Sequence, residues 1–150
     1  MNPEPGLFRY ARRVQFAETD LAGIVHFSWY FRYMEEAEHA LWRTSGLTIE
    51  RAGAQTGWPR VAASFEYKHP LLFEDQFEDV LRITALGRRS ITYAHTFQRG
   101  DTIVGTGTIT TVHVSKDPDG SMKSVDIPGE FLARLRATLA DGEGEGARGR

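Results

Sequence analysis

Hydrophobic and polar residues alternate along five stretches of the chain. In the fourth stretch, for example, Ile91, Tyr93 and Phe97 occupy positions of one parity, with threonine and alanine between them. Successive side chains of a strand point to opposite faces, so this pattern predicts an antiparallel sheet with one packed face. The expected strands are Leu7 to Phe16, Val61 to His69, Phe77 to Leu86, Ile91 to Gln98 and Ile103 to Val114.

The stretch from Ser28 to Ser45 has helical spacing instead. It contains no proline or glycine, and Ser28 and Gly46 suit the residues just before and just after a helix. A second, shorter amphipathic segment from Glu130 to Leu139 follows Pro128 and Gly129 and predicts another helix. On the long helix the apolar face would carry Tyr30, Met34, Ala37 and Leu41, and the opposite polar stripe Arg32, Glu36, His39 and Arg43.

The order of these elements indicates the fold class. One strand, a long helix and four further strands favour an α+β fold, with an antiparallel sheet wrapped around a long central helix. A single helix covers only part of such a sheet, so we expect the chain to complete its burial by associating with a second copy.

Length and composition fit one globular domain. The chain has 150 residues, which we divide into a single domain at 1–140 and a disordered tail at 141–150, where glycine alternates with charge. There is no cysteine, which excludes a thiolate metal site and a cysteine nucleophile. The net charge of -2 disfavours a nucleic-acid partner. Because the chain shows neither a signal peptide nor a long apolar run, we expect a cytoplasmic protein with no membrane partner.

The segment between the first strand and the long helix carries candidate chemistry. Asp20 lies on a loop before the helix, whose first backbone amides bring partial positive charge. A carbonyl oxygen bound by those amides would be polarised while the carboxylate faced its carbon. Gly23 permits the close backbone turn that such a layout needs. An acidic residue before a helix is nevertheless more often a cap or a solvated loop residue.

The motif Asp20-Leu21-Ala22-Gly23-Ile24-Val25, followed by aromatic residues and then Tyr30, resembles the signature of hot-dog fold acyl-CoA thioesterases of the 4-hydroxybenzoyl-CoA thioesterase type. The similarity extends from about Leu7 to Pro128. The resemblance implies that Asp20 attacks the thioester carbonyl or activates a water, and that the amide of Phe27 polarises the thioester oxygen. It implies no cofactor, because coenzyme A is part of the substrate.

The resemblance also suggests other site residues. Many relatives carry a tyrosine and then a histidine, or two aromatic residues, after the turn, whereas here His26 precedes Phe27, so His26 either assists the carboxylate or packs. Glu35 is a candidate for a supporting role, or for the catalytic carboxylate that a second branch of the fold places on its helix. Basic residues near the phosphates of coenzyme A are expected at Arg88, Arg89 and Ser90, with Lys123 and Arg60 as weaker candidates. The acyl pocket or the core would hold Trp29, Tyr30, Tyr33 and Trp58.

Three other functions are alternatives to the hydrolysis of acyl-CoA thioesters. A hot-dog dehydratase or hydratase also acts on acyl thioesters, but its Asp-x-Asn-x-x-His motif is one residue shorter than the Asp20 to His26 spacing and needs an asparagine that is missing here. A non-catalytic acyl-thioester-binding protein would keep the pocket without turnover. Glu36 and His39 have the spacing of a di-iron motif, but only one copy is present, so no metal is expected. The resemblance implies a homodimer or homotetramer with sites between protomers.

Overall fold

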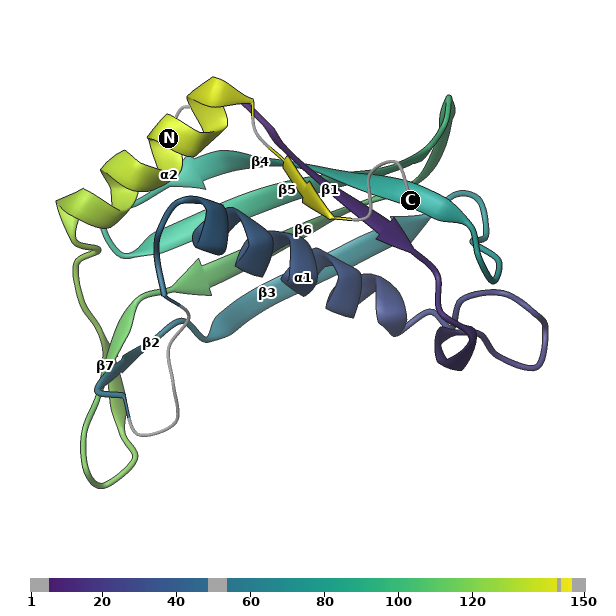
Figure 1. The fold of residues 1–150 in the computed structure, drawn as a ribbon. Coiled ribbons are helices and arrows are strands. Elements are labelled where there is room, and N and C mark those ends of the chain that lie inside the picture. Colours follow the sequence, from purple (N-terminus) through teal and green to yellow (C-terminus); the bar gives the residue numbers. More distant parts are fainter. Residues whose placement is uncertain (1–5, 49–53, 143, 147–150) are drawn as a thin grey trace.

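The computed structural model describes residues 6–48, 54–142 and 144–146. Within them, a six-stranded sheet curls around a long helix (Figure 1). The strand order is β3-β6-β5-β4-β1-β9, and all pairs are antiparallel except β1 with β9. The strands are β1 (Phe8–Arg13), β3 (Arg60–Tyr67), β4 (Gln76–Leu86), β5 (Ser90–Arg99), β6 (Thr102–Val112) and β9 (Gly144–Gly146).

A small second sheet continues from one end of the large one. It has the order β2-β7-β8 and joins β2 (Thr56–Gly57), β7 (Val114–Lys116) and β8 (Met122–Ser124). The alternation pattern predicted one strand from Ile103 to Val114. The chain instead leaves the large sheet after β6 and starts β7 at Val114, so this second sheet was not expected.

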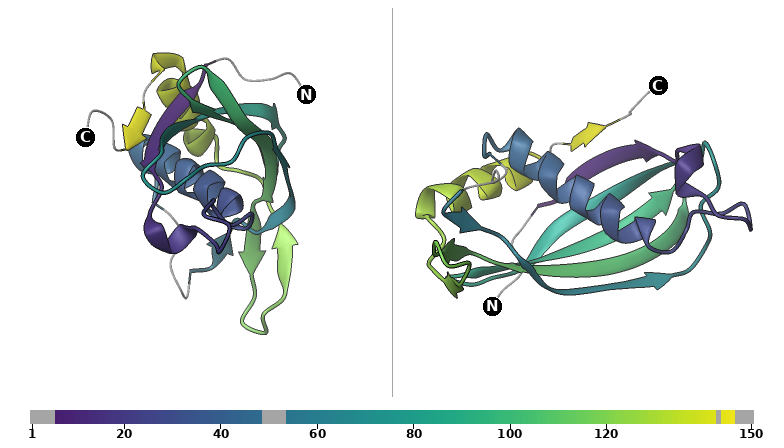
Figure 2. Two further views of the ribbon diagram at one scale, coloured as in Figure 1. Left: turned by 90° about the vertical axis from the view of Figure 1, so that its right-hand side faces the viewer. Right: turned by 90° about the horizontal axis from the view of Figure 1, so that it is seen from below.

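The long helix α1 (Trp29–Thr44) lies on the concave side of the large sheet, between β1 and β3 (Figure 2). The predicted helix boundaries are confirmed, with Ser28 before the helix and Gly46 in the left-handed conformation after it, at φ +75°. The apolar face that the spacing predicted is buried against the sheet. The second helix α2 (Gly129–Asp141) covers the end of the sheet where β4 turns into β5 (Figure 1).

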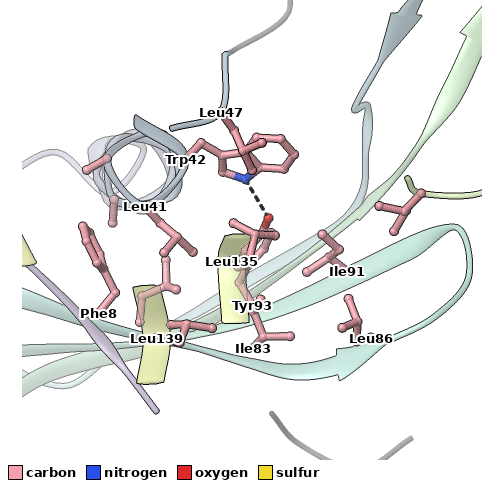
Figure 3. Close-up of a cluster of buried hydrophobic side chains, with 14 residues drawn as sticks. Phe8, Leu41, Trp42, Leu47, Ile83, Leu86, Ile91, Tyr93, Leu135 and Leu139 are labelled. Carbon is pink, nitrogen blue, oxygen red and sulfur yellow. Dashed lines mark hydrogen bonds between the residues drawn. The ribbon is translucent and has the colours of Figure 1, made fainter. Parts of the chain in front are cut away.

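Two clusters of buried side chains hold α1 on the sheet. One lies around the second half of α1, where the Trp42 indole donates a hydrogen bond of 3.1 Å to the Tyr93 hydroxyl (Figure 3). The other lies under the first half of α1 and consists mainly of aromatic residues, including Tyr30, Tyr33 and Phe97. The start of α1, which carries the candidate site, therefore rests on a closely packed aromatic support.

Two glycines in β6 leave room for a side chain of the neighbouring strand β3 and for one of α1. A Cβ at Gly107 would lie 2.6 Å from Met34 Sδ on α1 and 2.7 Å from the ring of Phe65 on β3. A Cβ at Gly105 would lie 2.5 Å from the same ring. The Phe65 ring therefore occupies the space that side chains at these two positions would need.

The strand β3 is an edge of the large sheet, and most of its side chains are exposed. Val61 is 61% exposed and Tyr67 is 48% exposed. An eight-residue edge with apolar side chains is a template for pairing with another strand. The surface formed by residues 60–67 is called the β3 edge below.

Two other expectations need correction. The first strand ends at Arg13, and the chain then forms a short 3₁₀ helix, η1 (Phe16–Glu18), because Glu18 accepts a hydrogen bond from the Gln15 amide in a capping box. The tail was expected to be disordered from residue 141. Instead, α2 extends to Asp141, and Gly144–Gly146 pair with β1, where Glu145 forms an ion pair with Arg43 of α1. Residues 143 and 147–150 lie outside the described part.

Candidate active site

The segment between η1 and α1 forms a small hairpin. Thr19 and Val25 pair in an antiparallel bridge, and the Asp20 amide donates to the Ile24 carbonyl at 2.9 Å. Val25 is buried and points into the core. Because side chains alternate along paired strands, Asp20 is placed on the opposite, outward face of this hairpin.

Asp20 is held in place by the turn that follows it. Its Oδ1 accepts a hydrogen bond of 2.9 Å from the Ala22 amide, and its carbonyl oxygen accepts one of 2.9 Å from the Gly23 amide. Gly23 has φ +83°, a conformation that L side chains rarely adopt. Glycine adopts this φ without strain, and among the described residues no hydrogen bond is formed to Asp20 Oδ2.

The entrance to α1 supplies a free backbone donor. The amide of Trp29 donates to the His26 carbonyl at 2.9 Å, and the amide of Ser28 faces His26 Nδ1 at 3.3 Å. The Phe27 amide between them makes no hydrogen bond to any residue in the described part of the chain. The Phe27 carbonyl accepts a hydrogen bond of 2.9 Å from the Tyr67 hydroxyl at the end of β3. The free amide therefore sits at the positive end of α1, on a backbone that β3 holds.

A buried carboxylate that the sequence analysis missed anchors this hairpin. Glu18 is 3% exposed and accepts hydrogen bonds from Arg12 of β1 at 2.6 Å and from the Tyr33 hydroxyl of α1 at 2.6 Å. Burial acts to raise the pKa of Glu18, but the hydrogen bonds from Arg12, the Gln15 amide and Tyr33 outweigh burial and lower it. The carbonyl of Glu18 also accepts from the His26 amide at 2.9 Å. The Gln15 to Glu18 spacing is that of a capping box, but the usual serine or threonine at the first position is missing, so the sequence signal was weak.

The structure gives definite surroundings to two other residues suggested by the resemblance. His26 is exposed, stacks on Phe27 with ring centroids 4.6 Å apart, and has its Nδ1 2.8 Å from the Ser28 hydroxyl, so its hydrogen bond goes to Ser28 and not to Asp20. Tyr30 is 3% exposed and packs in the aromatic cluster. Tyr30 therefore supports the start of α1 as part of this cluster.

Glu35 does not contact the hairpin. Its Oε2 lies 3.2 Å from Arg60 NH1 on β3, and the Glu35 side chain is 44% exposed. The expected supporting role next to Asp20 therefore falls to Glu18, while Glu35 belongs to the space between α1 and β3. Arg60, a weaker candidate for phosphate binding, is occupied by Glu35 and by Glu38 at 2.9 Å.

A buried chain of charges connects α1 to the sheet. His95 of β5 is fully buried, with Nδ1 2.6 Å from Asp79 of β4 and Nε2 2.9 Å from Glu38 of α1. Burial alone would lower the pKa of His95, but the attraction of Asp79 and hydrogen bonds to both carboxylates raise it to about 9. Burial raises the pKa of Asp79 to about 6 against the opposing attraction of His95. His95 has the same parity along β5 as the buried residues Ile91, Tyr93 and Phe97, so its side chain points to the packed face. The sequence did not indicate its two carboxylate partners.

The basic turn lies far from Asp20 within one chain. Arg88 and Arg89 follow β4, at the end of the sheet where Leu86 pairs with Ile91, whereas the connection between β1 and α1, to which Asp20 belongs, lies at the opposite end (Figure 1). Both guanidinium groups bind Asp126 at 2.9 Å, which lowers the pKa of that carboxyl. Ser90 begins β5, and its carbonyl accepts from the Gly87 amide. The single carboxylate of Asp126 neutralises only one of the two guanidinium charges, so the turn keeps a net positive charge.

The residues considered for a metal have other partners. Glu36 accepts hydrogen bonds from Arg12 at 2.8 Å and from the Tyr10 hydroxyl at 3.0 Å, and its ion pair therefore goes to β1 and not to the helix stripe. His39 lines a hollow beside Trp42. Across the described ranges, no group of three or more metal-ligating side chains is placed to hold an ion. None of the helices that the structure describes is both long and apolar enough to span a membrane.

Comparison with known proteins decides the family. The model of the thioesterase-like superfamily matches residues 14–135. The chain belongs to this superfamily. A hypothetical protein from Aquifex aeolicus, whose crystal structure is known, is 37% identical, with a TM-score of 0.77 over 85% of this chain and 98% of its own.

Other members of the thioesterase-like superfamily have named activities. A 1,4-dihydroxy-2-naphthoyl-CoA hydrolase from Synechococcus elongatus is 31% identical over 84 residues, which is 54% of this chain and 62% of the relative. The structure of a gentisyl-coenzyme A thioesterase is 29% identical, with a TM-score of 0.74 over 85% of this chain and 98% of its own. A 4-hydroxybenzoyl CoA thioesterase, at 18% identity and a TM-score of 0.78, shows the shared fold. The expected hot-dog fold is confirmed.

Proposed function

We propose that the protein hydrolyses acyl-CoA thioesters to a free acid and coenzyme A. The observation that carries the proposal is the free Phe27 amide at the positive end of α1, with Asp20 presented by the hairpin just before it. The named activities of the naphthoyl-CoA and gentisyl-CoA relatives support the same reaction class. Asp20 and Phe27 are assigned as the catalytic groups.

The chemistry proceeds by one of two routes. In the first, Asp20 Oδ2 attacks the thioester carbon, the thiolate of coenzyme A leaves, and water cleaves the resulting anhydride. In the second, Asp20 takes a proton from a water that attacks directly. In both, the Phe27 amide donates to the oxygen that gains negative charge. Because a thiolate leaves readily, the reaction requires neither a strong general acid nor a cofactor.

A second copy of the chain would complete the site. The β3 edge is exposed and apolar, and pairing of this edge with itself about a two-fold axis is antiparallel. Arg60 of one copy would then face Tyr67 of the other, beside Phe27. The end of the sheet that carries Arg88 and Arg89 would lie at the Asp20 end of the partner. This arrangement supports a homodimer, alone or within a tetramer, in which the positive turn of one copy receives the phosphates of coenzyme A bound by the other.

The decisive test is release of free thiol from saturated, aromatic and 2-enoyl-CoA substrates by the intact protein and by Asp20→Asn. The carboxamide has the same size but is neither a nucleophile nor a base, so we expect turnover to fall by at least about 10²-fold with substrate binding retained. Near-normal turnover in Asp20→Asn would remove Asp20 from the mechanism. Water addition to the 2-enoyl-CoA without thiol release would identify a hydratase, and binding without either reaction a non-catalytic acyl-thioester-binding protein. In single-turnover hydrolysis in heavy-oxygen water, label in the Asp20 carboxylate would identify the anhydride route, because direct attack of water on the thioester never labels Asp20.

The role of the basic turn is tested with two thioesters that share an acyl group. Replacing both Arg88 and Arg89 by alanine should raise KM for the acyl-CoA but leave KM for the matching acyl-pantetheine unchanged, because pantetheine lacks the nucleotide phosphates. Replacing both Arg134 and Arg136 by alanine on the exposed side of α2 also removes two positive charges and is the charge-matched control. Equal effects on both thioesters would show that the turn does not recognise the nucleotide end.

A further inference from the structure

Two hollows follow each other along the same side of α1. The first is a groove that starts at Ser28 and runs between α1 and β3, with Phe31, Glu35 and Ala63 among its walls. The second is a cavity of about 180 Å³ beside the second half of α1. The lining residues of this cavity are Glu38, His39, Trp42, Thr48, Trp58, Arg60, Tyr93 and Thr111.

Arg60 joins the two hollows because its side chain lines both. Its guanidinium lies 3.2 Å from Glu35 in the groove and 2.9 Å from Glu38 in the cavity. The first residue of the groove, Ser28, follows Phe27 directly. The two hollows are therefore placed one after the other along α1 from the assigned thioester position, with Arg60 and its ion pairs to Glu35 and Glu38 between them.

The cavity suits an uncharged group, and two polar atoms of its walls, Trp58 Nε1 and Thr111 Oγ1, have no hydrogen-bond partner among the described residues. Trp42, Trp58 and Tyr93 supply aromatic walls, with the Trp42 and Trp58 ring centroids 5.1 Å apart at 67°. The charge of Glu38 is matched by Arg60, and burial lowers the pKa of His39, which keeps that ring neutral at pH 7. A cavity of about 150 Å³ can hold a benzene molecule, so this one, whose walls are part aromatic and part polar, has room for a ring or several methylene groups.

The cavity lies too far along α1 for a small acyl group. Glu38 is nine residues after Trp29, which is roughly 14 Å along the helix axis. An extended chain advances roughly 1.2 Å per bond, so the span corresponds to roughly 12 bonds. A benzoyl group at the thioester position would end within the first groove.

We propose that the cavity between α1, Trp58 and Tyr93 is a specificity site for the far end of an extended acyl group, reached from Phe27 through the groove along β3. The inference rests on the proposed thioesterase function and names its substrate class. The preferred substrates are thioesters of about ten or more carbons with an uncharged, apolar or aromatic end. The groove and the cavity would bind the acyl group, and Arg60 would lie beside it where they join.

The test compares chain-length profiles of the full-length protein and Thr48→Trp. Thr48 lines the cavity and is exposed to solvent. An indole at this position can therefore enter the cavity from its open side and reduce its volume. We measure kcat/KM for thiol release from acetyl-CoA to dodecanoyl-CoA and from benzoyl-CoA. For the parent protein, kcat/KM should rise toward dodecanoyl-CoA, because each buried methylene contributes about a factor of four.

Thr48→Trp should lower kcat/KM for dodecanoyl-CoA by about 10-fold or more. The value of kcat/KM for benzoyl-CoA should change by less than about 2-fold. Ala133→Trp, which adds the same side chain on the exposed side of α2, is the matched control and should keep the parent profile. A parent profile that is flat with chain length, or one that Thr48→Trp leaves unchanged, would overturn the specificity site without affecting the proposed hydrolysis.

A binding measurement separates this inference from the proposed function and covers the case in which Thr48→Trp does not fold. Bromine quenches nearby indoles, so ω-bromodecanoate bound with its end in the cavity should quench the fluorescence of Trp42 and Trp58. The measurement uses Trp29→Phe, because Trp29 at the start of α1 would itself be quenched by a bromine near the thioester position. In that variant, quenching by ω-bromodecanoate should exceed quenching by α-bromodecanoate at equal occupancy, and adding Trp58→Phe should reduce the difference. Equal quenching by the two isomers would contradict the proposal. Quenching without thiol release from any thioester would support the binding site in the cavity but contradict the proposed hydrolysis.

Discussion

Replacing His95 by glutamine should strongly destabilise the protein. His95 is the cation between Asp79 and Glu38, and all three side chains are buried. Glutamine keeps similar size and hydrogen bonding but removes the charge, which leaves Asp79 without a cationic partner. Removing one member of a buried ion pair costs about 3–5 kcal/mol, so we expect the free energy of unfolding to fall by about that amount.

The pH dependence of stability gives an independent measure of the same interaction. The pKa of His95 is raised from 6.5 to about 9 on folding. A raised pKa means that the folded state binds the proton more tightly, so the stabilisation is fully present below pH 6.5 and is lost as the pH rises through 9. The shift corresponds to roughly 3 kcal/mol at 1.36 kcal/mol per pKa unit.

Urea unfolding followed by tryptophan fluorescence at pH 6.5 and at pH 9.5 tests both statements. His113→Gln is the matched control, because His113 is also buried but bonds to the backbone carbonyl of Asp126 at 3.1 Å and not to a carboxylate. His113→Gln should cost about 1 kcal/mol, as expected for one neutral hydrogen bond, and keep the pH dependence. Two results would show that the buried charge chain does not stabilise the fold. One is that His95→Gln unfolds at the same urea concentration as the parent. The other is that His95→Gln loses as much stability as the parent between pH 6.5 and pH 9.5.

Three smaller substitutions, one of them with a control substitution, test other features. Glu18→Gln should lower kcat by about 10–100-fold, because the hairpin that carries the carboxylate loses its charged anchor to Arg12; steady-state kinetics on folded protein checks this. Gly107→Ala should lower the free energy of unfolding by about 1–3 kcal/mol through overpacking, whereas Gly100→Asn, in an open turn at positive φ, should melt like the parent. Arg43→Ala removes an exposed ion pair to β9 and should change stability by less than about 1 kcal/mol in the same thermal melts.

The elements with regular periodicity were predictable from the sequence. The period of 3.6 between Ser28 and Ser45 and the alternation along β4 and β5 are local signals, and the structure confirms both the helix and these strands. The short elements β2, β8 and β9 were not predictable. Each has two or three residues and exists because another part of the chain lies beside it.

The candidate site was predictable only in its linear part. The segment from Asp20 to Phe27 is continuous in sequence, so its motif could be recognised. The contacts of Glu18 with Arg12 and Tyr33 join β1, η1 and α1, and no spacing rule connects such residues. The distance between the basic turn and Asp20 depends on the fold of one chain and on the placement of a second.

The glycine pair in β6 limits how this protein can change. Side chains at Gly105 and Gly107 would displace Phe65, and at Gly107 also Met34, so a substitution there disturbs the edge strand and the central helix together. No single compensating change restores both contacts, since one lies on β3 and the other on α1. Variation in substrate preference is therefore expected to accumulate at positions such as Thr48 and Phe31, where side chains can change one at a time, while β6 stays fixed.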